Sequence, residues 1–122
     1  MFQKLIIAGN LGKDPEQRFT PSGQAVTSFN VATNRSYSDA DGQQKKEVTW
    51  FHVSVWGKQA ESCHTCLKKG SSVIVEGRLL PDPETGSPRL FKRTDGSTGS
   101  SFEVVASNVR FLSGKGESAP GR

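Results

Sequence analysis

The sequence predicts an all-β fold, a small barrel of five strands with one short helix between the third and the fourth. Two observations carry this prediction. Thirteen glycines and six prolines fall mostly between short apolar runs, so turns are frequent and a long helical bundle is disfavoured. Five of those runs have strand character, whereas one segment has apolar residues at helical spacing. A chain of 122 residues suits one compact domain that needs neither a metal nor a disulfide.

The strongest strand signal is residues 47–56, EVTWFHVSVW, which are rich in β-branched and aromatic residues and contain no Gly or Pro. Alternation along a strand predicts a core face with Thr49, Phe51, Val53 and Val55, and an opposite face with Val48, Trp50, His52, Ser54 and Trp56. Exposed large aromatic side chains tend to mark binding surfaces. A second hydrophobic layer or a subunit contact is the structural alternative for the two indoles.

Four further strands are expected at residues 2–11, 25–35, 72–80 and 102–112. Polar segments rich in turn residues join them at 13–23, 36–46 and 81–101. The first of these contains a short edge strand at 18–19. The third is long for a structureless loop, and its stretch 89–93 is predicted to pair as a strand at the tip of a protruding hairpin.

The single helix is predicted at residues 58–69, where Ala60, Cys63 and Leu67 form an apolar stripe and Gly70 serves as the C-terminal cap. Five strands with a helix between the third and fourth, and long loops after the first, second and fourth, are the layout of an OB-fold, a Greek-key barrel. An SH3-like barrel or a small β-sandwich also accepts five strands. The position of the helix favours the OB-fold.

The domain is expected to span residues 1–112. Residues 113–122 contain mainly Gly, Ser, Lys, Glu, Ala and Pro and are predicted to form a disordered tail. No apolar run reaches the roughly 18 residues of a membrane span, and the N-terminus lacks a charged region followed by a hydrophobic signal core. A cytoplasmic protein without a membrane partner is therefore expected.

A formal charge of +4 and a pI near 9.3 are compatible with a polyanionic partner. Exposed aromatic rings stack on any base, and nearby cations neutralise phosphates. The candidate stacking residues are Trp50, Trp56, Tyr37 and Phe91. The candidate phosphate contacts are Lys4, Arg18, Arg35, Lys58, Lys69, Arg78, Arg89, Lys92 and Arg93. A single cation is ordinarily a solvated surface charge, so the argument rests on the interleaving of aromatic and basic residues at 89–93.

The sequence gives little support to a metal site, a redox site or an enzyme. Cys63 and Cys66 could supply two zinc ligands, but a structural site needs four, and only His52 and His64 remain. A redox pair gains from a helix N-terminus, whereas Cys63 lies mid-helix on the apolar stripe. We therefore expect a core role for Cys63, and no metal or cofactor. Phosphate-cradling loops, nucleophile elbows and paired carboxylates are also missing from the sequence, so no enzyme is expected. His52 fits either a packing or subunit contact or a phosphate or base contact.

Several blocks together resemble the bacterial single-stranded DNA-binding protein family. They are LIIAGNLGKDPE (5–16), RFTPSG (18–23), FNVAT (29–33), WFHVSVWGK (50–58), LKKG (67–70) and VEG (75–77). They run in the family's order from residue 2 to about residue 112, so the resemblance covers nearly the whole chain. Blocks in one order are far more specific than any one of them.

The resemblance implies an OB-fold that assembles as a homotetramer and wraps single-stranded DNA during replication, recombination and repair, in association with the nucleoid. It matches Trp50, Trp56, Tyr37 and Phe91 to stacking positions, and Lys4, Arg18, Lys58 and Lys69 to basic positions along the DNA backbone. A protein-interaction module on the same fold, in which the aromatic face contacts protein, is the alternative.

Three departures from the family pattern stand out. The 81–101 loop is longer than is typical. Phe51 stands where some relatives have a subunit-contact histidine. Family members usually end in an acidic tip closing on Phe that recruits replication and repair proteins, whereas this chain ends ESAPGR. Recruitment through such a tip is therefore not expected here, and either a truncation or a divergent paralogue would account for the difference.

Overall fold

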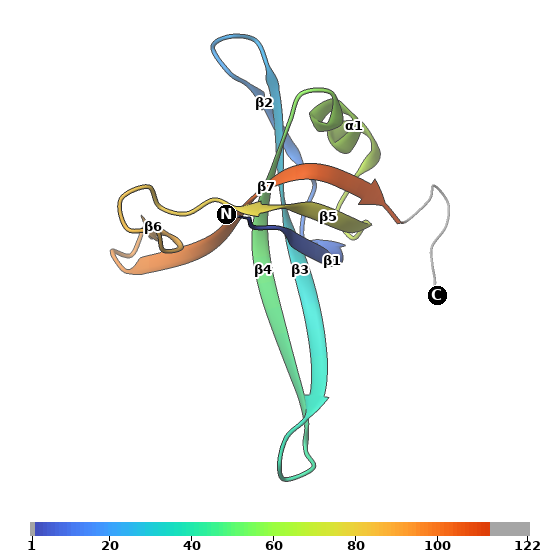
Figure 1. Cartoon of the computed structure of the whole chain (residues 1–122), viewed down its shortest axis with the longest axis vertical. Coiled ribbons are helices and arrows are strands. Elements are labelled where there is room, and N and C mark those ends of the chain that lie inside the picture. The colour runs from blue at the N-terminus through green and yellow to red at the C-terminus, as the bar shows by residue number, and fades with distance from the viewer. Residues whose placement is uncertain (1, 113–122) are drawn as a thin grey trace.

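The computed structural model describes residues 2–112, and Figure 1 shows their arrangement. In chain order the elements are β1 (Leu5–Leu11), β2 (Glu16–Phe19), β3 (Ala25–Ser38), β4 (Gln44–Trp56), α1 (Lys58–Cys66), β5 (Ser72–Leu79), β6 (Arg89–Lys92) and β7 (Thr98–Phe111). The tail predicted at 113–122 lies outside the described residues. Within residues 2–112, no helix is long and apolar enough to cross a membrane.

Five of the strands close into a barrel. The hydrogen-bonded order is β1-β5-β7-β4-β3, and a second pairing between β1 and β3 completes the ring. β4 and β7 pair in parallel, whereas the other barrel pairs are antiparallel. β2 and β6 are short additions on β3 and β7. With α1 between the third and fourth barrel strands, the predicted five-stranded OB-fold is confirmed.

Alternating valines fill the barrel. Val31, Val53, Val73 and Val75 each have 0% of their surface exposed, and full burial of such a side chain contributes about 1.5–3 kcal/mol. The core face predicted for β4 is confirmed at Val53 and Val55. Its other two members, Thr49 and Phe51, are only half-buried, because β4 leaves the barrel here and pairs with β7 only from residue 51 onward.

The β3–β4 hairpin is longer than predicted and forms the long finger at the bottom of Figure 1. Residues 36–46 were expected to be a polar connection, but pairing continues to Ser38 and Gln44. The turn itself is held by Asp39, whose Oδ1 accepts the backbone N–H groups of Asp41 and Gln43 at 2.9 Å each. Backbone pairing satisfies N–H and C=O groups whatever the side chains are, so the polar composition did not end the strands.

The β6–β7 hairpin confirms the strand pair predicted within residues 89–93. Arg89 pairs with Ser101, and Lys92 pairs with Thr98. The last barrel strand therefore begins at residue 98 rather than at 102. In Figure 1 this second hairpin projects from the barrel in a different direction from the finger.

The helix ends earlier than predicted, and Gly70 is not its cap. The C-cap is Leu67, with an extended backbone (φ −100°, ψ 153°), and its side chain is 6% exposed. Leaving the helix at this point lets Leu67 enter the core. Gly70, with φ 90°, lies in the following turn, where its N–H donates to Leu11 O at 2.9 Å.

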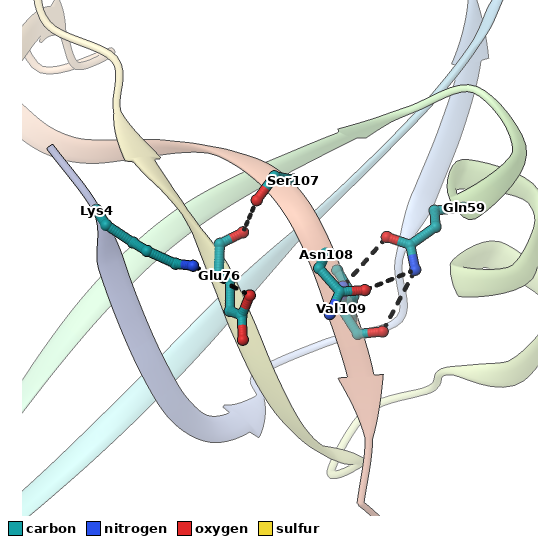
Figure 2. A network of polar contacts seen from close by, with 6 residues as sticks. All are labelled: Lys4, Gln59, Glu76, Ser107, Asn108 and Val109. Carbon is teal, nitrogen blue, oxygen red and sulfur yellow. Dashed lines mark hydrogen bonds and ion pairs between the residues drawn. The ribbon is translucent and has the colours of Figure 1, made fainter. Parts of the chain in front are cut away.

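Two polar side chains tie α1 to the barrel. Thr27 Oγ1 donates to the carbonyl of Ala60 at 2.6 Å. The side-chain amide of Gln59 bonds to the backbone and a side chain of β7 (Figure 2). Its Oε1 accepts from Val109 N at 3.1 Å, and its Nε2 donates to Asn108 Oδ1 at 3.3 Å and to Val109 O at 3.5 Å. The helix is therefore fixed over one end of the barrel.

Candidate nucleic-acid interface

Both indoles of β4 lie on the face turned away from the core, as the alternation predicts. Trp50 is 52% exposed and Trp56 is 44% exposed. Trp50 packs on Gly12, where an added Cβ would lie 2.7 Å from the ring. Trp56 stands directly across from Val26 of β3, which is 1% exposed. One side of each indole therefore faces the protein, and the rest of its surface is exposed and available for stacking.

The finger carries the third candidate ring. Tyr37 is 37% exposed, and the Arg35 guanidinium carbon lies 4.7 Å from the centre of its ring. Arg35 Nη1 also contacts Glu47 Oε2 at 3.0 Å. Directly opposed residues of antiparallel strands share a face, and Tyr37 opposes residue 45 whereas Trp50 opposes residue 32. By this register, Tyr37 and Trp50 lie on opposite faces of the finger.

The second hairpin carries the fourth ring. Phe91 is 46% exposed, and the Arg93 guanidinium carbon lies 5.4 Å from its centre. Both side chains rest on Gly99, where an added Cβ would lie 2.6 Å from Phe91 Cζ and from Arg93 Nη2. Arg93 Nη1 donates to Thr98 O at 3.0 Å. The ring and the cation are therefore held together at a defined place on the hairpin.

The basic candidates divide into paired and unpaired groups. Lys4 Nζ lies 3.7 Å from Glu76 Oε1 (Figure 2), and Arg35 pairs with Glu47. In residues 2–112 the others form no ion pair; they are Arg18, Lys58, Lys69, Arg78, Arg89, Lys92 and Arg93. They are not gathered in one patch, since β2, which carries Arg18, and β6, which carries Arg89 and Lys92, lie in different parts of the molecule in Figure 1.

One polar cluster was not predicted from the sequence. His52 Nδ1 lies 2.9 Å from Glu103 Oε1, and Ser101 Oγ donates to Glu103 Oε2 at 2.7 Å. Burial opposes ionisation of Glu103, but these two hydrogen bonds, together with the charges of His52 and Arg89, lower the pKa of its carboxyl. The parallel pairing of β4 with β7 places residues 52 and 103 opposite each other, and no local sequence signal indicates that pairing.

The two cysteines have different surroundings. Cys63 is 0% exposed, and burial, with a smaller effect from Cys66, raises the pKa of its thiol to about 11. Cys66 is exposed. Cys63 is thus a core residue, as predicted. No group of three or more metal-ligating side chains occurs in the part of the chain that the structure describes.

Comparisons with known proteins agree on one family. The model of the Single-strand binding protein family matches residues 2–112. A single-stranded DNA-binding protein of Neisseria meningitidis serogroup A is 35% identical over 118 residues, which cover 97% of this chain and 64% of that protein. The chain therefore spans less than two thirds of that relative.

Two solved structures share the fold. A deletion mutant of the single-stranded DNA-binding protein from Thermus aquaticus has a TM-score of 0.72 and 29% identity, over 94% of this chain and 52% of that one. The Plasmodium falciparum protein in complex with single-stranded DNA has a TM-score of 0.75 and 22% identity, over 92% of this chain and 96% of that one.

Proposed function

Because this chain belongs to the Single-strand binding protein family, we propose that it binds and protects single-stranded DNA without strict sequence preference. The observation that carries the proposal is the half exposure of Trp50 and Trp56 on the outward face of β4. Stacking on such rings contributes about 1–3 kcal/mol per base and tolerates any base. The family is one of binding proteins, and this chain is not an enzyme.

The unpaired cations supply the second part of the mechanism. They neutralise phosphates and release counterions, so affinity falls as salt rises. Their spread along the molecule suits a long path of DNA rather than one short footprint. Tyr37 and Trp50, on opposite faces of the finger, are both reached by a strand that passes around it. Phe91 and its neighbouring cations extend that path onto the second hairpin.

The wider role follows from the same family. In this proposal the protein acts as a cytoplasmic, nucleoid-associated homotetramer in DNA replication, recombination and repair. Sedimentation of the free protein at a mass near four times the 13.2 kDa of one chain supports the tetramer. A species of one or two chains at micromolar concentration contradicts it.

Titration with oligo-dT, followed by Trp fluorescence, tests the binding. We expect strong quenching and a log-log salt slope of about −0.7 for each phosphate neutralised. Trp56→Ala should weaken binding by about 5- to 150-fold, the range of one stacked base, with an unchanged circular-dichroism spectrum. Unaltered fluorescence and no oligonucleotide binding at low salt would refute the proposed function.

A further inference from the structure

A hollow of about 410 Å³ opens beside Trp50, where β4 and the start of β7 run in parallel. It is lined by Asn30, Val48, Thr49, Trp50, Phe51, His52, Ser100, Ser101 and Phe102. Its lining combines three aromatic residues with an amide, an imidazole and three hydroxyl groups. Such a mixture of apolar walls and few polar groups is characteristic of sites for small ligands.

The aromatic residues of the lining lie on two faces of the sheet. The rings of Phe51 and Phe102 lie 5.8 Å apart, tilted by 38°, on the face where Phe51 packs against the core. Trp50, which is 52% exposed, lies on the opposite face together with His52, by alternation along β4. A planar group that stacks on Trp50 therefore meets the side chain of His52 on the same face.

The hydrogen-bonding character of His52 is set by Glu103. An ionised carboxylate can only accept, so Nδ1 of His52 carries the hydrogen of the 2.9 Å contact with Glu103 Oε1. In the neutral imidazole, Nε2 is then an acceptor. Ser101 donates its hydroxyl to the other oxygen of Glu103 at 2.7 Å. This second bond holds the carboxylate in place.

Asn30 stands directly opposite His52 on β3. In the part of the chain that the structure describes, its side-chain amide has no hydrogen-bond partner. An amide offers two N–H donors and a carbonyl acceptor. Asn30 and His52 thus present donors and acceptors side by side, next to aromatic rings. Proteins recognise the edges of unstacked bases with this combination of stacking and polar groups.

We propose that one nucleobase of the bound strand stacks on the Trp50 ring at the edge of this hollow and is hydrogen-bonded through its own edge to Asn30 and His52, which lie on the same face as Trp50. Glu103 is a positioning residue that fixes the tautomer and orientation of His52. This inference rests on the proposed function and adds to it a preference among bases, because the edges of different bases carry different donors and acceptors. Stacking elsewhere on the surface remains indifferent to the base.

Oligo-dT and oligo-dC of equal length test the subsite, since these pyrimidines differ mainly at the hydrogen-bonding edge. The measurement is the ratio of the two dissociation constants at constant salt. Asn30→Ala should change this ratio by about fivefold or more, the effect of one base-edge contact. Trp56→Ala is the matched control, because it should weaken binding of both oligonucleotides by the same factor and leave the ratio unchanged.

Variants of Glu103 test whether this residue acts by positioning His52 or only by packing. Glu103→Gln keeps a carbonyl acceptor for His52 and should retain the wild-type ratio, whereas Glu103→Leu should change it as Asn30→Ala does. If either Glu103 variant fails to fold, the Asn30→Ala ratio decides the proposal alone. A ratio unchanged in Asn30→Ala, with both oligonucleotides still bound, overturns the subsite and leaves the proposed function standing.

Two further outcomes are informative. If the wild-type protein binds neither oligonucleotide, the proposed function itself fails, and the subsite fails with it. If Trp50→Ala lowers the mass of the assembly in sedimentation, a second copy of the chain covers this face, and the subsite is overturned. An unchanged mass, with an altered ratio in Trp50→Ala, supports it.

Discussion

The indole of Trp50 lies over the α-carbon of Gly12, so that a Cβ at residue 12 would come within 2.7 Å of Cη2 and Cζ3 of the ring. Gly12 is not among the glycines with a positive φ, so its backbone conformation does not require glycine. Glycine is required instead because the Trp50 ring leaves no room for a Cβ at this position. The atoms that an added Cβ would meet are the far end of a half-exposed side chain, which can turn aside. Gly12 therefore determines where the ring lies.

Gly12→Ala should displace the Trp50 ring and weaken oligo-dT binding. The loss should not exceed that of Trp50→Ala, about 5- to 150-fold for one stacked base. The free energy of unfolding should stay within about 0.5 kcal/mol of wild type, as for other surface changes. Parallel titrations and urea unfolding of both variants measure the two effects.

Gly9→Ala is the control for that prediction. A Cβ at residue 9 would lie 2.1 Å from the carbonyl oxygen of Ala32, which belongs to the backbone of a paired strand and cannot turn aside. Gly9→Ala should therefore destabilise the barrel by about 1–3 kcal/mol or more. Equal destabilisation by Gly12→Ala would contradict the account given for Trp50.

Glu47→Gln should tighten DNA binding. Glu47 holds Arg35 at 3.0 Å, beside the Tyr37 ring, and so competes with a phosphate for the same guanidinium. An exposed ion pair contributes at most about 1 kcal/mol, so its loss should raise affinity for oligo-dT by about two- to fivefold. If the released Arg35 then neutralises one more phosphate, the log-log salt slope steepens by about 0.7.

Glu61→Gln provides the matched control, because it also removes one negative charge. Glu61 is exposed on α1 and forms no ion pair with any other residue in 2–112. A clearly smaller effect is expected. Equal tightening by Glu47→Gln and Glu61→Gln would show that overall charge, rather than release of Arg35, is responsible.

The fold was predictable because strand alternation and helical spacing are local signals. Each valine of the barrel belongs to a run whose apolar residues recur every second position, and Ala60, Cys63 and Leu67 recur at helical spacing. Element ends were less predictable. Residues 36–38 and 44–46 are polar, so their hydrophobic pattern gives no information, and pairing of their backbones alone extends the hairpin.

The outward-facing aromatic residues of the site were predictable from the same local signals, but two contacts of the site were not. Alternation alone places Trp50 and Trp56 on the outward face of β4. The contact of His52 with Glu103 depends on a parallel pairing of strands 51 residues apart, and the contact of Trp50 with Gly12 depends on closure of the barrel. Neither relationship has a local signal, because each arises only when distant strands meet.

Acidification should lower the free energy of unfolding through protonation of Glu103. Burial opposes its ionisation, but the bonds from His52 and Ser101 outweigh burial, and the pKa of the carboxyl is lowered from its usual value of 4.5. A lowered folded-state pKa means that ionised Glu103 stabilises the fold above about pH 4.5, and that this contribution is lost as pH falls through the folded value. Between about pH 6 and about pH 3, wild type should lose more unfolding free energy than Glu103→Gln. A constant difference between the two proteins in urea unfolding across that range would contradict this.

The two thiols should differ sharply in reactivity. Because burial raises the pKa of the Cys63 thiol to about 11, an aromatic disulfide reagent at about pH 8 should modify only the exposed Cys66 rapidly. Cys66→Ser should abolish the fast phase, Cys63→Ser should leave it, and denaturant should release the second thiol. Slow labelling of Cys63 then reports local opening of α1.

Gln59→Ala removes the three hydrogen bonds that join α1 to β7, so it should accelerate the slow labelling of Cys63 while the fast labelling of Cys66 stays the same. Unchanged slow labelling in Gln59→Ala would mean that packing of the apolar stripe alone holds the helix on the barrel.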